Sequence, residues 1–107
     1  MTLHHPSRDE IELPAVLHAL SDPQRLHIVR LLAEQDGSVP CGSLELTVTK
    51  STATHHFRVL REAGVVHQVP TGTTKLTTLR RADLDAVLPG LLDAVLAAAA
   101  VDAPSAA

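Results

Sequence analysis

KSTATHHFRVLREAG, the stretch from Lys50 to Gly64, has the pattern of a short amphipathic helix. Its apolar residues recur at intervals of four and three, which puts them on one side of a helix: Ala53, Phe57 and Leu60. The Thr49 hydroxyl is suited to accept from a free backbone N–H of the first turn. Gly64 stands where a left-handed residue commonly ends a helix, so we expect the helix to span residues 50–63.

The other side of this helix is polar and basic. It carries, at the same spacing, Ser51, Thr54, His55, Arg58 and Arg61. Such side chains hydrogen bond to base edges and phosphates, and the N-terminus of a helix itself favours a phosphate. The face therefore has two interpretations, a DNA-recognition surface or an ordinary solvated surface.

The 107 residues predict one domain with a modest core. Because the chain has no Trp or Tyr and a single Phe, this core must be aliphatic. Chains this small often gain stability by pairing with a second copy, and we expect a homodimer. The single cysteine, Cys41, excludes an internal disulfide framework and a multi-cysteine zinc site within one chain.

Neither end of the sequence indicates secretion or membrane insertion. The first ten residues, MTLHHPSRDE, lack the apolar segment of a secretory signal. The longest apolar run, residues 91–101, is interrupted by Asp93 and is too short to cross a bilayer. Together with the lone cysteine, these features predict a cytoplasmic protein that does not contact a membrane.

The net charge of −3 is distributed unevenly along the chain. Residues 1–49 carry three Arg against seven Asp or Glu, and residues 82–107 carry four Asp without a Lys or Arg. Residues 50–81 carry six Lys or Arg against Glu62 alone, which gives +5. A basic middle between acidic ends is expected when one face meets phosphates, and a chance distribution on a soluble surface is the alternative.

Three helices are predicted before the one at residues 50–63. The first lies within residues 10–20, where Pro14 is expected to start the helix rather than to continue it. The second spans 23–34 with Asp22 as its N-cap, although a capping box from the preceding serine would serve as well. The third spans 40–47 and is linked tightly to the helix that follows it. Two short helices joined in this way, the second with a polar outer face, form the helix-turn-helix pattern.

After Gly64 the sequence period changes to that of strands. Residues 65–69 are β-branched, Pro70-Thr71-Gly72-Thr73 is a turn sequence, and residues 75–79 alternate polar and apolar. This predicts a β-hairpin directly after the helix, which makes the motif a winged helix-turn-helix. The fold class is therefore mainly α with a small β-hairpin (α+β), in the order α-α-α-α-β-β-α.

The last predicted element is helical, begins near Ala82 and has an apolar stripe along one side. Pro89-Gly90 interrupts it, so we expect either a kink or a short helical turn followed by a new helix. The stripe follows a core that is already complete, so it is the predicted dimer surface. With one residue from the first helix, the predicted interface is Ile11, Leu84, Leu88, Leu91, Leu92, Val95 and Leu96. The domain organisation is then a flexible segment at 1–9, a winged-helix DNA-binding and dimerisation domain at 10–97 and a flexible tail at 98–107.

With these elements in order, the chain resembles the ArsR/SmtB-type winged-helix transcriptional regulators over about residues 17–96. The strongest parts are ALSDPQRLHIVRLL at residues 19–32 and KSTATHHFRVLREAG. The Ser-Thr-x-x-His-His-x-x-x-Leu-x-x-x-Gly frame of the second is typical of that family's recognition helix. The resemblance implies a homodimer, paired through its first and last helices, that binds a palindromic operator in double-stranded DNA.

The residues expected to bind DNA come from the recognition helix and the wing. The N-terminal half of a recognition helix enters the major groove, and Arg58 lies one turn later, within reach of a base or a phosphate. The wing tip is less basic than is common in relatives, which predicts a weaker phosphate contact there. The full set is Lys50, Ser51, Thr52, Thr54, His55, Arg58, Arg61, Thr73 and Lys75.

Metal sensing, known in parts of this family, has incomplete motifs here. Members of one type carry a Cys-x-Cys pair where this chain has Cys41 alone, and another type uses Asp and His pairs on a last helix that here contains no His. His4 and His5 are the candidate ligands for nickel or zinc, across a dimer, and scattered surface histidines are the alternative. Cys41 is a small core residue or a redox sensor.

No feature of the sequence indicates an enzyme, because paired carboxylates, a nucleophile elbow and a glycine-rich phosphate loop are all missing. The alternative to a DNA-binding regulator is a winged-helix protein-interaction module, or a regulator without its own effector site that depends on a partner protein as co-regulator. Lys50, Arg58 and Arg61 beside the recognition frame favour DNA.

Overall fold

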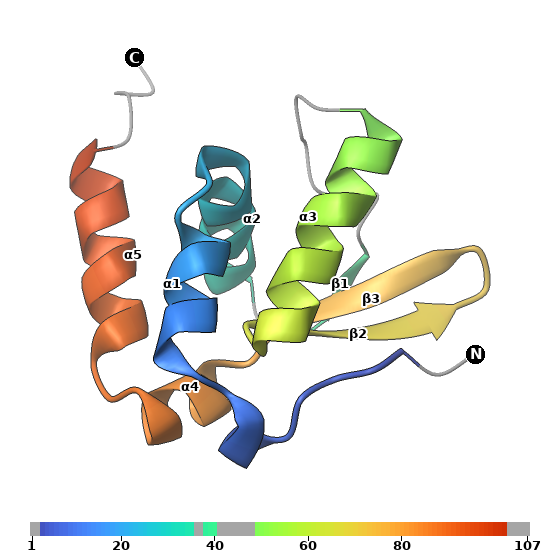
Figure 1. The fold of residues 1–107 in the computed structure, drawn as a ribbon. Helices are drawn as coiled ribbons and strands as arrows, with labels where there is room; N and C mark the ends of the chain where they lie inside the picture. Colours follow the sequence, from blue (N-terminus) through green and yellow to red (C-terminus); the bar gives the residue numbers. More distant parts are fainter. Residues whose placement is uncertain (1–2, 36–37, 41–48, 103–107) are drawn as a thin grey trace.

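The computed structural model describes residues 3–35, 38–40 and 49–102 as a mainly helical domain with one small sheet (Figure 1). In chain order the elements are the 3-10 turn η1 (Arg8–Glu10), α1 (Leu13–Leu20), α2 (Pro23–Ala33), β1 (Val39–Pro40), α3 (Lys50–Ala63), β2 (Val66–Thr71), β3 (Thr74–Leu79), α4 (Arg81–Val87) and α5 (Leu91–Asp102). The α+β winged helix-turn-helix class predicted from the sequence is confirmed, and the element order differs in detail.

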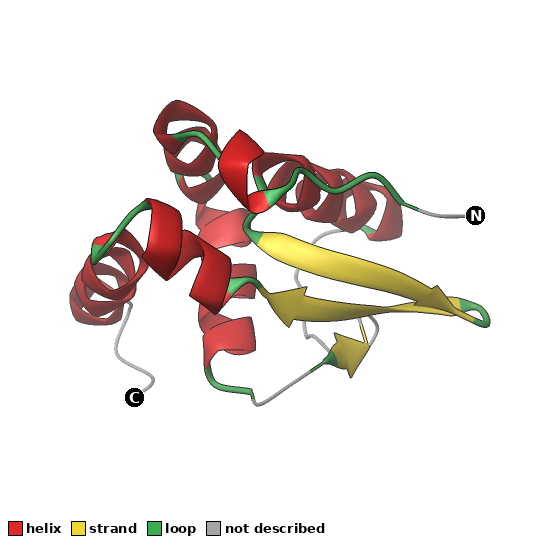
Figure 2. Cartoon of the chain, turned by 90° about the horizontal axis from the view of Figure 1, so that it is seen from below, coloured by secondary structure: helices red, strands yellow, loops and turns green. Residues whose placement is uncertain are grey.

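The helices form the body of the molecule, and the β2–β3 hairpin extends away from them beside α3 (Figures 1 and 2). The helix starts follow from local chemistry. Pro14 lies in the first turn of α1, which begins at Leu13, so the expected role of this proline at the helix start is confirmed. Asp22 caps α2, because its Oδ2 accepts from the backbone N–H groups of Gln24 (2.9 Å) and Arg25 (3.1 Å).

The sheet has three antiparallel strands in the order β1-β3-β2. In β1, Val39 pairs with Thr77 and Pro40 with Leu76, so Pro40 belongs to a strand and not to the start of the predicted helix at 40–47. An edge strand tolerates proline because one row of its backbone groups needs no partner. Residues 41–48, including Cys41 and the rest of that predicted helix, lie outside the described residues.

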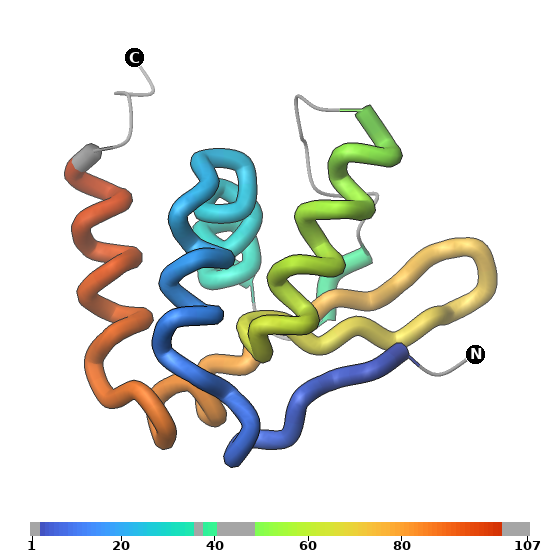
Figure 3. Tube along the Cα trace, in the orientation of Figure 1, coloured from blue at the N-terminus to red at the C-terminus, as the bar shows by residue number. Residues whose placement is uncertain are grey.

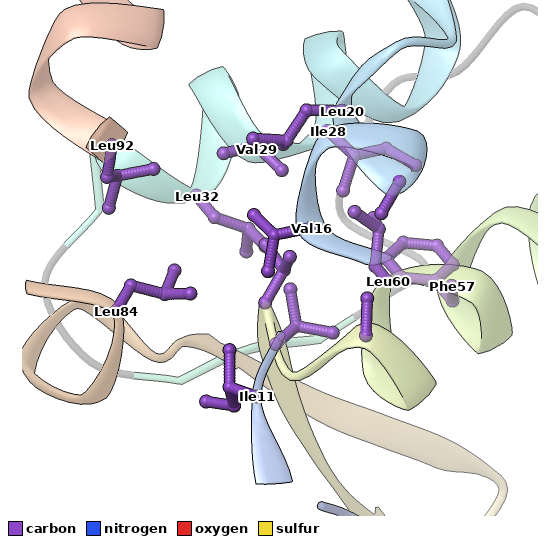
Figure 4. Close-up of a cluster of buried hydrophobic side chains, with 14 of the residues drawn as sticks. Ile11, Val16, Leu20, Ile28, Val29, Leu32, Phe57, Leu60, Leu84 and Leu92 are labelled. Atoms are coloured by element: carbon purple, nitrogen blue, oxygen red, sulfur yellow. The ribbon is translucent and has the colours of Figure 1, made fainter. Parts of the chain in front are cut away.

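Helices α1 to α5 all contribute buried side chains to one hydrophobic core, which is aliphatic except for Phe57 (Figure 4). The side chains labelled there are Ile11, Val16, Leu20, Ile28, Val29, Leu32, Phe57, Leu60, Leu84 and Leu92. Three of these had been expected at a dimer interface, namely Ile11, Leu84 and Leu92. They are at most 5% exposed in the single chain, because the subunit needs them to complete its own core.

Residues 3–9 were expected to be flexible, but they run along β2 and back to α4 (Figure 3). Arg80 Nη1 donates to the Pro6 carbonyl oxygen (2.8 Å), which fastens this segment to the start of α4. Arg8 and Arg80 both donate to Asp83 and thereby lower the pKa of its carboxyl. The N-terminal segment is thus part of the folded domain.

The break predicted at Pro89-Gly90 separates helices α4 and α5. The chain bends by 113° between the two helices. Gly90 adopts the left-handed conformation (φ +80°) that lets the chain turn there. No single helix in the described ranges is long and apolar enough to cross a membrane, although the bent pair α4–α5 passes that test on combined length and composition.

Candidate nucleic-acid interface

Helix α3 begins and ends where its capping residues predict. The Thr49 hydroxyl oxygen accepts from the Thr52 backbone N–H (3.3 Å) and donates to the Thr52 hydroxyl (2.9 Å). At the other end, Gly64 has φ +89° and donates its N–H to the carbonyls of Leu60 and Arg61. The predicted helix over residues 50–63 is therefore confirmed at both ends.

The inner face of α3 holds the helix against the core. Phe57, Leu60 and Ala63 are buried and Ala53 is half-buried, so the apolar face predicted from the spacing is confirmed. Contacts with α1, α2 and β2 fix the helix in place. Packing of the inner face against the core therefore fixes the direction in which the outer face points.

The outer face presents six of the predicted DNA-binding residues, all exposed: Lys50, Ser51, Thr52, Thr54, His55 and Arg58. Three of their hydroxyls already have local partners, and that of Ser51 lies 3.5 Å from the Thr49 hydroxyl. Thr52 takes part in the cap, and the Thr54 hydroxyl donates to the Lys50 carbonyl (2.9 Å) and keeps its lone pairs for another donor. Within the described ranges, the side chains of Lys50 and Arg58 make no hydrogen bond or ion pair, so both cationic groups are available to a ligand.

The hairpin beside α3 supplies a second basic and polar edge. Thr71 pairs with Thr74 across the turn, and Gly72 has φ +62°. Thr73 at the tip is exposed and Lys75 is half-buried on β3. The hairpin lies next to α3 and extends beyond the helical body, so the wing and the recognition helix are neighbours (Figure 1).

Comparisons with known proteins agree with this geometry. Residues 22–68 match the family described as bacterial regulatory protein, arsR family. The uncharacterized HTH-type transcriptional regulator YceK of Bacillus subtilis (strain 168) is 36% identical over 80 residues, which cover 73% of this chain and 80% of that protein. The chain belongs to the ArsR family.

Two further similarities extend over different shares of this ArsR-family protein. The uncharacterized HTH-type transcriptional regulator MJ1325 of Methanocaldococcus jannaschii is 37% identical over 59 residues, which cover 54% of this chain and 66% of that protein. The structure of the transcriptional repressor BigR from Xylella fastidiosa superposes with a TM-score of 0.64 at 26% identity, covering 86% of this chain and 87% of the other. The family comprises DNA-binding transcriptional regulators and not enzymes, and its helix-turn-helix members bind double-stranded DNA.

Arg61 was predicted to bind DNA, but in this ArsR-family protein it has a partner within the subunit. Its Nη1 donates to Gln68 Oε1 (3.0 Å), and Gln68 Nε2 donates to the Thr77 hydroxyl (3.2 Å). This series of hydrogen bonds connects the end of α3 with β2 and β3. Because Arg61 is half-buried there, we expect it to hold the wing against α3 rather than to contact a phosphate.

The two candidate metal ligands, His4 and His5, lie in different environments. His4 is exposed, whereas the His5 ring stacks on His67 (4.1 Å between centroids) and its Nε2 accepts from the Gln68 backbone N–H (3.0 Å). Among the described residues, no group of three or more His, Cys, Asp or Glu side chains is placed to hold a metal ion. The structure thus uses His5 to hold the N-terminal segment on β2.

Sequence reasoning missed one buried polar pair behind the recognition helix. Arg25 of α2 and His56 of α3 are 7% and 8% exposed, and Arg25 Nη1 lies 3.3 Å from His56 Nδ1. The two residues are 31 positions apart, so no local spacing connects them. A weak indication was available, since an arginine that interrupts an apolar stripe needs a polar partner when it is buried.

Proposed function

We propose that this protein is a homodimeric ArsR-type transcriptional regulator that binds a palindromic operator, with α3 of each subunit in a major groove. The observation that carries the proposal is the outer face of α3. It presents exposed donors, together with cations that have no ion-pair partner in the described part of the chain, on a helix whose inner face is fixed in the core. Because its proposed partner is double-stranded DNA, we expect it to act in the cytoplasm.

The side chains have different roles in this proposal. Ser51, Thr54 and His55 lie on the N-terminal half of α3, so they would contact base edges. Lys50 and Arg58 would contact phosphates, and Thr73 and Lys75 of the wing would add a weaker contact to the backbone. Phosphate contacts supply affinity and base contacts supply selectivity. Substitutions in the first group should therefore lower the affinity for every duplex, and substitutions in the second should change the preferred bases.

Dimerisation is proposed through α1 and α5. Leu13 and Leu17 are 43% and 46% exposed, and they lie one helical turn apart on the same side of α1. On α5 and just before it, Leu88, Leu91, Val95 and Leu96 are only half-buried. Large aliphatic side chains exposed in this way are better explained by a partner subunit than by water.

The test is fluorescence anisotropy with a duplex selected from a random pool by the parent protein. A variant carrying Ser51→Ala, His55→Ala and Arg58→Ala should fold, because all three side chains are exposed, and should lose most of its affinity for that duplex. Circular dichroism checks the fold. Equal affinity of this variant and the parent would remove the assignment and favour a protein-interaction module, or a regulator that depends on a co-regulator.

A response to nickel or zinc does not form part of this proposal. In the ranges that the structure describes, His4 and His5 do not converge with a third ligand. Calorimetry with nickel and zinc, with and without the selected duplex, tests this point. Metal binding that changes the affinity for DNA would restore the metal-sensor hypothesis.

A further inference from the structure

Arg25 connects the C-terminal end of α1 with the recognition helix. Its Nε donates to the Ala19 carbonyl (2.7 Å) and its Nη2 to the His18 carbonyl (3.3 Å). Carbonyls at a helix C-terminus carry partial negative charge, so a buried guanidinium is favourable there. The same guanidinium reaches α3 through Nη1, which lies 3.3 Å from His56 Nδ1.

The direction of the contact with His56 follows from chemistry. A guanidinium can only donate, so Nδ1 of His56 is the acceptor and the ring proton is on Nε2. Asp22 Oδ2 lies 3.9 Å from the same Nδ1 and accepts from the Arg25 backbone N–H (3.1 Å). Arg25, His56 and Asp22 thus form a polar cluster between the start of α2 and α3. His55 lies at its outer edge, where its ring is tilted against that of His56 (5.9 Å between centroids).

Such a cluster constrains α3 in a way that the apolar core does not. Hydrophobic contacts are non-directional and tolerate a small rotation of a helix, whereas a buried hydrogen bond to a charged group depends on its geometry. Leaving a buried guanidinium N–H without its acceptor is costly, so the arrangement with Arg25 bonded to His56 is strongly preferred. The orientation of α3 relative to α1 is therefore fixed at this point.

We propose that Arg25 and His56 are positioning residues that set the angle between α1 and the recognition helix, and thereby the spacing of the two half-sites that the dimer accepts. The inference rests on the proposed function, since α1 carries the proposed dimer contacts and α3 the base contacts. Neither residue touches DNA, because both side chains are buried. In a symmetric dimer, a change in this angle moves the two recognition helices relative to one another.

The experiment compares His56→Leu with His56→Asn. Leucine has a similar size but offers no acceptor, and the asparagine oxygen can occupy the position of Nδ1 and still accept from Arg25. The probes are the duplex selected by the parent and versions of it in which the spacer between half-sites is one base pair longer or shorter. We expect the parent to discriminate against the altered spacers by roughly tenfold, His56→Leu to lose most of this discrimination, and His56→Asn to retain it.

A role in stability alone would weaken binding to all spacers equally and leave the ratio unchanged, which would overturn the inference. If His56→Leu fails to fold, Arg25→Lys provides the same test. Lysine keeps the charge but lacks the planar fork that joins three partners, and it should also lose spacing discrimination. A parent protein that selects no duplex would overturn the proposed function, whereas full discrimination by both variants would overturn this inference alone.

Discussion

Gly64 lies between the end of the recognition helix α3 and the start of the wing strand β2. Both its backbone conformation and the space around it require glycine. Its φ of +89° is a conformation that L side chains rarely adopt. A Cβ at this position would lie 2.6 Å from Ile11 Cγ1 and 3.4 Å from Pro6 Cγ. The glycine therefore also allows the N-terminal segment to pack against the end of α3.

Gly64→Ala should lower the free energy of unfolding by about 2–4 kcal/mol, because backbone strain and a clash with a buried side chain add together. The matched control is Gly72→Ala, where φ is +62° but nothing lies within 4 Å of an added Cβ. It should cost about 1 kcal/mol. Urea denaturation measures both values. Similar costs for the two variants would show that the contact with Ile11 is unimportant.

His5 gives the N-terminal segment a dependence on pH. Its pKa is lowered by burial first and then by the nearby charges of His67, Arg61 and Arg80, against a smaller raising effect of the hydrogen bond with Leu3. The unfolded chain therefore binds a proton more readily than the folded one. The stability from this contact is complete above the ordinary histidine pKa of about 6.5 and is lost as the pH falls below it.

An NMR titration of the histidine rings tests this directly. The midpoint for His5 should lie below the ordinary histidine pKa of about 6.5, and the Gln68 amide signal should shift at the His5 midpoint, because protonated Nε2 no longer accepts from it. His5→Phe keeps a stacked ring and should remove that shift. A His5 midpoint at or above that ordinary value would contradict the assigned contact.

Helix α3 could be predicted from the sequence to within its capping residues because its determinants are local. Thr49, Gly64 and the apolar spacing all act within the segment, and the hairpin likewise follows from its alternation and turn residues. Strand β1 could not be predicted, because two residues show no period. The hydrogen-bond partners of Arg25 and Arg61 depend on tertiary packing. For this reason Arg61 was predicted to bind DNA, and the contact of Arg25 with His56 was not predicted.

Within α3, Lys50 and Ser51 should separate affinity from selectivity. Lys50→Ala should weaken binding to every duplex and reduce the slope of log affinity against log salt by about one unit, since one phosphate contact is lost. Ser51→Ala should leave that slope unchanged and alter the preferred bases. Anisotropy titrations between low and high salt distinguish the two. A salt slope that falls with Ser51→Ala and not with Lys50→Ala would reverse these roles.

The whole molecule has an exposed aliphatic surface on α1 that its own core does not cover. Ile11, Leu84 and Leu92, which the sequence assigned to the interface, are buried inside the subunit. A charge at any of them would disrupt folding and would say nothing about assembly. Leu13 and Leu17 are the informative positions, because both are exposed in the single chain.

Leu13→Asp combined with Leu17→Asp should give folded monomers that bind the selected duplex poorly, because a single recognition helix meets only one half-site. Light scattering after size-exclusion chromatography measures the mass. Val69→Asp is the control, since Val69 is exposed to the same extent (46%) but lies on the wing strand β2. A dimer that survives both α1 substitutions would place the interface elsewhere.

Methylation interference on the selected duplex tests most directly whether α3 of each subunit enters a major groove. Methyl groups on guanine N7 project into the major groove, and on adenine N3 into the minor groove. We expect N7 methylation to block binding in two patches about one helical turn apart on the same face of the duplex, and Arg58→Ala to weaken both equally. Interference confined to adenine N3, or a single patch of N7 interference, would contradict this mode of recognition.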